Sequence, residues 1–496
     1  MLALSVLSAH AGQSEKGSRP PSPKHSVFLP AVGRSAIYLV APGGSDGTGD
    51  GSAQRPWATI AHAVAQVEDG ATIAVAPGSY YGQVALSGHF PAGITVRAAV
   101  PYRTRLVNDA TVVTCFRCAG ITLEGFEITH TGPGAGRYLV QIQDTAGDGS
   151  GGRRVTMRNN IIHDSFNNDL VKVNNGAAEI RLQGNMFYNM GGPGLDSHVD
   201  INSASGVVVE DNIFFNDFPA SGRANGNNSG SYIVVKDSNG IADAILGSRQ
   251  VTIRRNVFLN WQGDDDNAFV VIGEDAVPYY QAYDVLVENN LLLGNSRHPL
   301  RVAFHVRGSK DIVFRHNTVS GDLPSKAFAL RLSRSPENPP NENVAFYNNV
   351  WSDPTGTMGA GAPGDPGDFA DAAPADTLSF TLLNNLYWNG GRAIPYDPLE
   401  LVNYDSDPAA LVADPKLADP AGVVSPVWQP ERGRFGGGAA TIRAVFLGLV
   451  EDYGLPAAGS AVAGAAEPAQ AAAEDILQRP RPAAGFPDLG AVEVAP

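Results

Sequence analysis

Short stretches of alternating apolar and polar residues recur along most of the chain. One kind ends in Asn followed by an apolar residue, as in VTMRNNII, IRLQGNMF and VVVEDNIF; its members carry Asn160, Asn185, Asn212, Asn256, Asn290, Asn317, Asn349 and Asn385. A period of two predicts strands with one buried face. The intervals between these Asn residues lie within about 20 to 50 residues, the range of solenoid repeats.

Each repeat holds a second alternating stretch, as in DLVKVNN, SHVDINS and SYIVVKDS. One coil cannot bury its apolar face alone, so the coils must stack. Asn suits the turn between strands because it tolerates left-handed backbone and can bond the Asn of the next coil. We therefore predict an all-β fold, a single-stranded parallel β-helix, since a propeller needs four strands per repeat.

The segment at residues 37–82 contains a strand, a Gly/Asp-rich loop and a short amphipathic helix at about residues 56–67. Together with the repeats, this opening resembles the right-handed parallel β-helix superfamily, which includes pectate-lyase-like enzymes. The resemblance implies that the helix caps the open end of the solenoid and that DLGAVEV, residues 488–494, forms a closing strand. It does not fix a function, because this fold hosts lyases, hydrolases, epimerases and adhesins.

The chain divides into three segments. Residues 1–35 hold a short apolar stretch, a small-x-small site at Ala9-His10-Ala11 and a polar linker. We predict a secreted or periplasmic protein with an incomplete signal, and an ordinary disordered end is the alternative. Residues 36–430 form the β-helix with loop insertions, notably the Gly/Pro/Asp-rich stretch 353–377. Residues 431–496 are an extension with an Ala-rich stretch, 457–473, that suits a helix.

Charge and composition narrow the partners. The 496 residues include 35 Lys and Arg against 50 Asp and Glu, a net charge of −15. This acidity argues against nucleic acid as a partner, and no apolar run is long enough for a membrane span. The oligomeric state is left open.

Two cysteines, Cys115 and Cys118, lie in the stretch TVVTCFRCAG. Residues three apart on an extended strand are separated by about 10 Å, too far for a disulfide, so we predict buried thiols. A lone CxxC supplies only half of a structural zinc site, and the strand-like flanks do not suit a thioredoxin-type motif.

Basic residues gather on one outward strip when the second stretches are aligned by their inward residues Val173, Ile201, Val235, Ile272, Val306 and Leu332. Stacked cations about 4.8 Å apart repel one another unless an anion binds them. The strip therefore predicts an acidic polysaccharide as partner, bound by Lys172, Asn174, His198, Asn202, Tyr232 and Arg331. Chance, or an ordinary solvated face, is the alternative.

The chemistry that such a strip supports is β-elimination from a uronate. Lys236 is the predicted base, provided that burial and neighbouring positive charge lower its pKa. Arg307 is the predicted carboxylate clamp or leaving-group partner, and His305 a secondary proton donor. Lys236 as a solvated surface lysine is the competing interpretation.

Hard oxygen ligands beside the strip suggest Ca²⁺, with Asp200, Asn202 and Glu274 as candidate ligands. The alternative is an Asn ladder next to a solvated Asp. The order of acidic cluster, Lys strand and Arg is similar to alginate- and chondroitin-type β-helix lyases. Those lyases place Arg-His-Gly soon after Lys-Ser-Ser, whereas here His305 precedes Arg307 and an intervening coil separates them from Lys236.

Two other functions remain open. A glycoside hydrolase of the polygalacturonase type needs two facing carboxylates, and the candidates are Asp264-Asp265-Asp266 and Glu274-Asp275, although an Asp-rich turn fits the triple Asp better. A non-catalytic glycan-binding or structural β-helix would use its Asn columns and the aromatic residues Tyr232, Trp261, Tyr279 and Tyr280.

Overall fold

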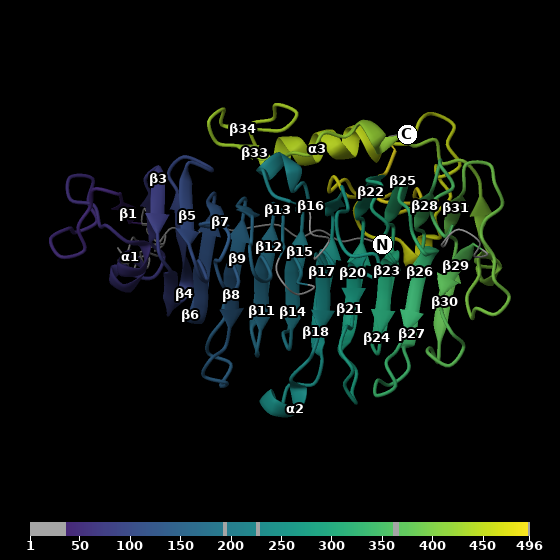
Figure 1. The fold of residues 1–496 in the computed structure, drawn as a ribbon, viewed down its shortest axis with the longest axis horizontal. Coiled ribbons are helices and arrows are strands. Elements are labelled where there is room, and N and C mark those ends of the chain that lie inside the picture. Colours follow the sequence, from purple (N-terminus) through teal and green to yellow (C-terminus); the bar gives the residue numbers. More distant parts are fainter. Residues whose placement is uncertain (1–35, 192–195, 225–228, 361–366, 495–496) are drawn as a thin grey trace, which may run out of the picture. The chain divides into compact units, whose positions relative to one another are not determined.

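Equivalent strands of successive coils pair in parallel throughout the solenoid (Figure 1). The computed structural model describes residues 36–191, 196–224, 229–360 and 367–494. Residues Ala36–Pro496 form one unit, and the predicted signal in 1–35 lies outside the described residues. The fold is a right-handed parallel β-helix, which confirms the predicted fold class.

Each coil contributes three strands, one more than predicted. A first column carries the strip and consists of β8 (Val140–Gln143), β11 (Val171–Asn174), β14 (Val199–Asn202), β17 (Ile233–Lys236), β20 (Ala268–Ile272), β23 (Val302–Arg307), β26 (Ala327–Ser333) and β29 (Asp368–Asp371). A second column precedes the repeated Asn and consists of β9 (Arg153–Arg158), β12 (Ala178–Gln183), β15 (Val208–Glu210), β18 (Ser248–Arg254), β21 (Ala282–Glu288), β24 (Lys310–Arg315), β27 (Glu342–Tyr347) and β30 (Phe380–Leu383).

A third column follows the repeated Asn and forms a separate 12-stranded sheet. Its strands are β3 (Gly78–Tyr81), β5 (Thr104–Asn108), β7 (Glu127–His130), β10 (Ile161–His163), β13 (Met186–Tyr188), β16 (Ile213–Phe215), β19 (Val257–Phe258), β22 (Leu291–Asn295), β25 (Thr318–Asp322), β28 (Val350–Ser352), β31 (Leu386–Trp388) and β32 (Leu411–Val412). The first coils add β1 (Ile37–Val40), β2 (Thr72–Val75), β4 (Val84–Ala98) and β6 (Val113–Glu124) to the other sheet.

The repeated Asn residues form a buried ladder between the second and third columns. Asn256 is typical: its Nδ2 donates to Asn290 Oδ1 at 3.0 Å and to the carbonyl of Val209 at 2.9 Å. Its Oδ1 accepts from Asn212 Nδ2 at 3.0 Å. The left-handed backbone lies one residue earlier than predicted, as at Arg255 with φ 51°. The ladder Asn therefore serves through its side chain rather than through its backbone.

Opposite charges alternate along the second column, two residues before the ladder Asn. Arg254 lies in register with Glu210 on one side and Glu288 on the other. Ion pairs of 2.9 Å join Arg158 to Glu124, Arg254 to Glu210, and Arg315 to Glu288. Directly opposed charges on paired strands stabilise the register of the coils.

The two ends of the unit differ from one another. Helix α1 (Ile60–Gln66) buries Ile60, Ala63 and Val64 in the main core at the first coils, as predicted. After the last coil the chain forms the hairpin β33 (Trp428–Gln429) and β34 (Arg434–Phe435), then α3 (Ile442–Tyr453), whose Phe446 and Leu449 pack on the outer face of the third column. Short helices α2 (Gly240–Asp243), η1 (Pro219–Ser221), η2 (Tyr404–Ser406), η3 (Pro420–Gly422) and η4 (Pro468–Gln470) complete the elements.

Three expectations for the irregular segments are wrong. The Ala-rich stretch 457–473 holds only the single turn η4, and the C-terminal helix is α3 instead. Residues 488–494 form no strand; Gly490 N donates to the Asn348 carbonyl and Ala491 N to Thr318 Oγ1, so this segment packs across the coils. The insertion 353–377 contains β29, which pairs with β26 in the first column with one register shift.

The cysteines form a disulfide, contrary to the prediction of free thiols. The Cα atoms of Cys115 and Cys118 lie 5.4 Å apart, about half the distance expected along a regular strand. The reason is an irregularity in β6: the pairing moves from Leu86 with Cys115 to Ser87 with Arg117, which inserts one extra residue. No helix among the described residues is long and apolar enough to cross a membrane.

A buried ion cluster under the third column predicts pH-dependent stability. His163 contacts Asp164 at 2.7 Å and Glu127 at 3.3 Å, and these carboxylates also pair with Arg223 and Arg105. Burial alone would lower the pKa of His163, but hydrogen bonds and attraction from Asp164 and Glu127 outweigh it and raise the pKa to about 9. The folded chain thus binds this proton more tightly than the unfolded chain, whose His pKa is near 6.5.

We expect this contribution to be complete below pH 6.5 and lost as the pH rises through 9, reducing the free energy of unfolding by about 2–3 kcal/mol. Urea unfolding at pH 6 and pH 9.5 measures the loss. His163→Gln removes the titrating group, so its stability should change less over the same interval. An equal change in both proteins would contradict the assignment.

Candidate functional site

The predicted alignment of the strip is the alignment in the structure. Ile201 pairs with Val173 and Val235, Ile272 pairs with Val235 and Val306, and Val306 pairs with Leu332. These inward residues all lie in the main core. Their outward neighbours consequently stack on the opposite face of β11, β14, β17, β20, β23 and β26.

Lys236 lies among carboxylates rather than among cations. Its Nζ is paired with Glu274, and lies 3.3 Å from Asp275 and 3.7 Å from Asp200. Lys172 is paired with the same Asp200, and its Nζ lies 3.8 Å from Asp169. We call these six residues the lysine–carboxylate cluster. It satisfies the two lysines internally, so the expected repulsion between them is largely relieved without a bound anion.

The cluster changes the protonation expected for Lys236. Burial favours the neutral amine, but attraction from Asp200, Glu274 and Asp275 is stronger in sum and raises the pKa above its ordinary value. The predicted lowering of this pKa is therefore wrong for this arrangement of side chains. Burial raises the pKa of Asp169 to about 8, whereas Lys172 and Lys236 overcome burial and lower the pKa of Asp200.

The three predicted metal ligands do not all fit a cation site. Asp200 and Glu274 meet at Lys236, and Asp200 Oδ1 is buried without a hydrogen-bond partner in the described part of the chain. Asn202 is engaged elsewhere, because its Oδ1 accepts from Ser238 N at 3.1 Å and its Nδ2 donates to Ser238 Oγ at 2.6 Å. A cation at Asp200 and Glu274 would therefore have to displace Lys236, and the Asn202 amide is held by Ser238.

A separate acidic group could bind a metal ion. Oxygen atoms of Asp368, Asp397 and Glu400 lie within 4.8 Å of one another. Among the described residues this is the one such group of at least three His, Cys, Asp or Glu side chains. It lies at β29 and in the loop that follows β31, apart from the predicted ligands.

Arg307 contacts Glu274, which is also a partner of Lys236. Its Nη1 donates to the carbonyl oxygen of Glu274 at 2.6 Å, so Glu274 joins the two cations through its backbone and its side chain. Gly273 brings them together: with φ +88°, it lets its backbone pass the carbonyl oxygen of Arg307, which would lie 1.8 Å from an added Cβ. The role of Gly273 is thus close backbone packing.

His305 is unsuited to the predicted role of proton donor. Only 4% of the residue is exposed, and its Nε2 lies 2.8 Å from Ser333 Oγ. Burial, followed by repulsion from Arg331, Arg307 and Arg301, lowers its pKa well below the ordinary value. The neutral imidazole that results is a weak acid.

His198 and Tyr232 do not face outward, so the prediction that they contact a glycan is wrong. Both are 1% exposed, and their rings lie 4.4 Å apart. His198 Nε2 bonds Asn216 Oδ1 at 3.0 Å, and Tyr232 OH donates to the carbonyl of Asn260 at 3.0 Å. Each residue lies just before its strand, β14 or β17, where the alternation of side chains no longer applies. Both side chains therefore turn into the core.

Arg331 lies on the strip, paired with a carboxylate that the sequence did not reveal. Its Nε is 3.0 Å from Asp371, and Arg301 Nε donates to the same oxygen at 2.7 Å. We call Arg301, Arg331 and Asp371 the Asp371 cluster. Asp371 belongs to β29, inside the insertion that suggested no chemistry; its signal was the short alternation DFAD.

The triple Asp of the hydrolase alternative forms a turn. Asp264 Oδ1 accepts from Asp266 N at 2.9 Å, and Asp266 pairs with Lys326 at 2.8 Å. The side chain of Asp266 is 64% exposed. The acidic side chains are thus used in a turn and in surface ion pairs.

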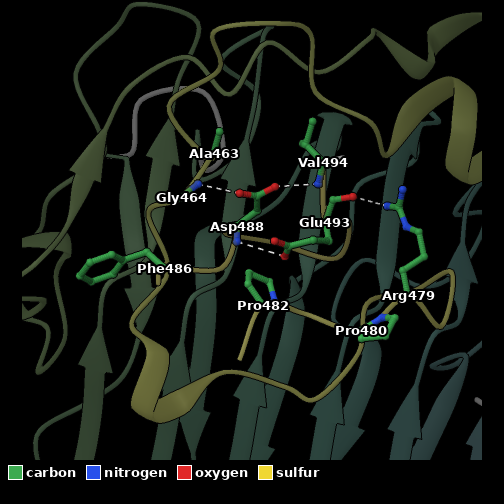
Figure 2. A pocket seen from close by; sticks show the side chains of 9 residues that line it. All are labelled: Ala463, Gly464, Arg479, Pro480, Pro482, Phe486, Asp488, Glu493 and Val494. Carbon is green, nitrogen blue, oxygen red and sulfur yellow. Dashed lines mark hydrogen bonds between the residues drawn. The ribbon is translucent and has the colours of Figure 1, made fainter. Parts of the chain in front are cut away.

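A cavity of about 750 Å³ lies within the C-terminal extension, away from the strip (Figure 2). Figure 2 shows Asp488 accepting from the backbone of Gly464 and Val494, at 2.6 Å in both cases. Glu493 accepts from Asp488 N at 3.1 Å. These carboxylates hold the extension together, and the remaining lining is largely apolar, so we place the candidate site on the strip.

Comparison with known proteins supports the fold. No protein-family model and no curated protein matches the chain. Among solved structures it is similar to pectate lyase Pel9A, with 15% identity and a TM-score of 0.51 over 93% of this chain and 97% of that one. XylC, solved with xylose, gives 13% identity and a TM-score of 0.50 over 92% and 98%.

A third structure, the PL6 family alginate lyase AlyGC, gives 12% identity and a TM-score of 0.49 over 77% of this chain and 54% of that one. At such identities the likeness establishes the pectate-lyase-like β-helix fold, and the activity must be argued from the side chains.

Proposed function

We propose that this protein is a polysaccharide lyase that cleaves an acidic, uronate-containing polysaccharide by β-elimination. The observation that carries the proposal is the convergence of Lys236 and Arg307 on Glu274, on the outward strip. Lys236 takes the C5 proton of a uronate, the C4–O bond breaks, and a C4–C5 double bond forms. The electron pair of the broken bond goes to the leaving oxygen, which takes a proton from water.

Arg307 contributes positive charge where the uronate carboxylate would lie. Its Nε is buried without a hydrogen-bond partner among the described residues, so the protein does not satisfy this guanidinium completely. Neutralising the carboxylate is what makes the C5 proton acidic, and a guanidinium is well suited to this because it binds carboxylates through paired donors.

The proposal includes Ca²⁺. Lys236 must lose a proton to act as a base, and its carboxylate neighbours favour the protonated amine. Asp200 and Glu274, with Asp275 beside them, would hold the ion. The bound cation would supply positive charge that neutralises the substrate carboxylate and disfavours the ammonium form of a neighbouring lysine. Export, as predicted from segment 1–35, would place the enzyme where such polysaccharides occur.

The test is incubation of the protein with polygalacturonate, alginate and chondroitin sulfate while the ultraviolet absorbance of unsaturated sugars is followed. A rise in absorbance supports elimination. New reducing ends without this absorbance would indicate a hydrolase instead of a lyase. Retention of a polymer without turnover would indicate a binding protein.

Metal removal gives a further prediction. Chelation with EDTA should reduce the elimination rate at least about tenfold, and added Ca²⁺ should restore it, since carboxylates lose their hard cation. Asp200→Asn should weaken this dependence on Ca²⁺. Asp397→Asn, in the separate acidic group, is the matched control and should leave the dependence unchanged. Full activity in EDTA would remove the metal from the proposal and leave elimination standing.

A further inference from the structure

Asp371 holds two arginines of the strip with one oxygen atom. Arg301 Nε donates to Asp371 Oδ2 at 2.7 Å, and Arg331 Nε lies 3.0 Å from the same atom. The side chains of the three residues are 25%, 18% and 24% exposed in the order Arg301, Arg331, Asp371. The cluster is thus accessible from solvent, and one carboxylate is shared by two guanidinium groups.

Charge is distributed unevenly along the strip. From β11 to β20 the carboxylates outnumber the cations, with Lys172 and Lys236 against Asp169, Asp196, Asp200, Glu274 and Asp275. From β23 to β29 the charges are closer to balance: Arg301, Arg307, Lys326 and Arg331 lie with Asp265, Asp266, Asp368 and Asp371, and Asp397 and Glu400 lie beside Asp368. Within the second region, the Asp371 cluster itself has two guanidinium groups and one carboxylate.

The arginines are incompletely compensated. Burial lowers the pKa of Arg331, and repulsion from Arg301 and Arg307 adds to this against the attraction of Asp371. The Nε atoms of Arg307 and Arg331 are buried without a hydrogen-bond partner in the described ranges, since Asp371 lies out of line for Arg331.

We propose that Arg301 and Arg331 form a second anion subsite, for a carboxylate or sulfate group of the polysaccharide, and that Asp371 is the internal anion displaced on binding. The subsite rests on the proposed function in one respect, that the strip is the polysaccharide-binding face. Arg331 lies three coils beyond Lys236, about 14 Å along the axis. A ligand that reaches both must therefore extend over several sugars.

Binding of defined polymers tests this inference. The measurement is titration calorimetry with polygalacturonate, alginate, chondroitin sulfate and neutral dextran, in the Lys236→Ala background so that no polymer is consumed. Asp371→Asn should bind at least one acidic polymer about tenfold more tightly, because it frees both arginines. Adding Arg331→Gln should cancel that gain, and dextran binding should not change. The polymer that shows the gain identifies the anion as carboxylate or sulfate.

Asp376→Asn is the matched control. Asp376 pairs with Arg334 at 3.3 Å with similar exposure, and this pair lies outside the Asp371 cluster. The control should bind all polymers like the parent. Thermal unfolding of each variant, and Arg331→Lys as a milder change that should keep part of the gain, separate binding effects from misfolding.

An unchanged affinity in folded Asp371→Asn would overturn the subsite, and so would an equal gain for dextran. These outcomes differ from failure of the proposed function. Tighter binding without any unsaturated product would keep the subsite and reject the lyase. Unsaturated product from the parent chain without a binding change in Asp371→Asn would keep the lyase and reject the subsite.

Discussion

Lys236→Ala should lower the rate of unsaturated product formation by about 10²- to 10⁴-fold, the range expected when a positioned base is removed. Lys236 lies on the strip and is connected to Arg307 through Glu274. The loss should appear in kcat, because Arg307 and Arg331 still bind the polymer. The measurement is the initial rate of ultraviolet absorbance at several substrate concentrations.

Lys310→Ala is the matched control, since Lys310 lies on β24, with its Nζ 5.2 Å from the ring centre of Tyr280. Its rate should stay within about twofold of the parent chain, as surface substitutions usually have small effects. Equal rates for Lys236→Ala and the parent would reject Lys236 as the base. Lys236→Arg should not restore the rate, because a guanidinium does not give up its proton.

Asn256→Ala should lower the free energy of unfolding by about 3–5 kcal/mol. The change removes the Asn256 side chain from Asn212 Nδ2, the Asn212 backbone N–H and the Val209 carbonyl, all of them buried, whereas Asn290 Oδ1 keeps the backbone N–H of residue 256. Each unsatisfied buried group is destabilising by about 1–3 kcal/mol. Neighbouring coils share the ladder, so the effect should extend beyond one coil.

Urea unfolding followed by circular dichroism measures this loss. Gln54→Ala removes an exposed side-chain amide from the N-terminal loop and should change the free energy of unfolding by less than about 0.5 kcal/mol. A loss below about 1 kcal/mol for Asn256→Ala would show that the ladder fixes the register without contributing strongly to stability.

The sequence predicted what depends on periodicity. Alternation, the repeated Asn and the inward column from Val173 to Leu332 are properties of each coil, and stacking makes them visible in one chain. They were sufficient to predict the register that brings Lys236 and Arg307 together. The third column was missed because its strands are short and almost wholly apolar, as in β16 and β19.

Features that depend on local irregularity could not be predicted. The bulge in β6 brings Cys115 to Cys118, and the turn before β14 directs His198 inward. The protonation of Lys236 depends on Glu274 and Asp275, which reach it from a loop of the next coil. Distances between side chains of different coils are set by such loops, whose lengths vary from one repeat to the next.

The alternating charges of the second column restrict how a solenoid of this kind changes its length. Removal of the single coil that carries Glu288 would set Arg254 directly against Arg315, and duplication of it would set Glu288 against its own copy. Like charges in that position repel, whereas loss or gain of two adjacent coils restores the order of signs. In this region, coils are therefore expected to be inserted or deleted in pairs during evolution.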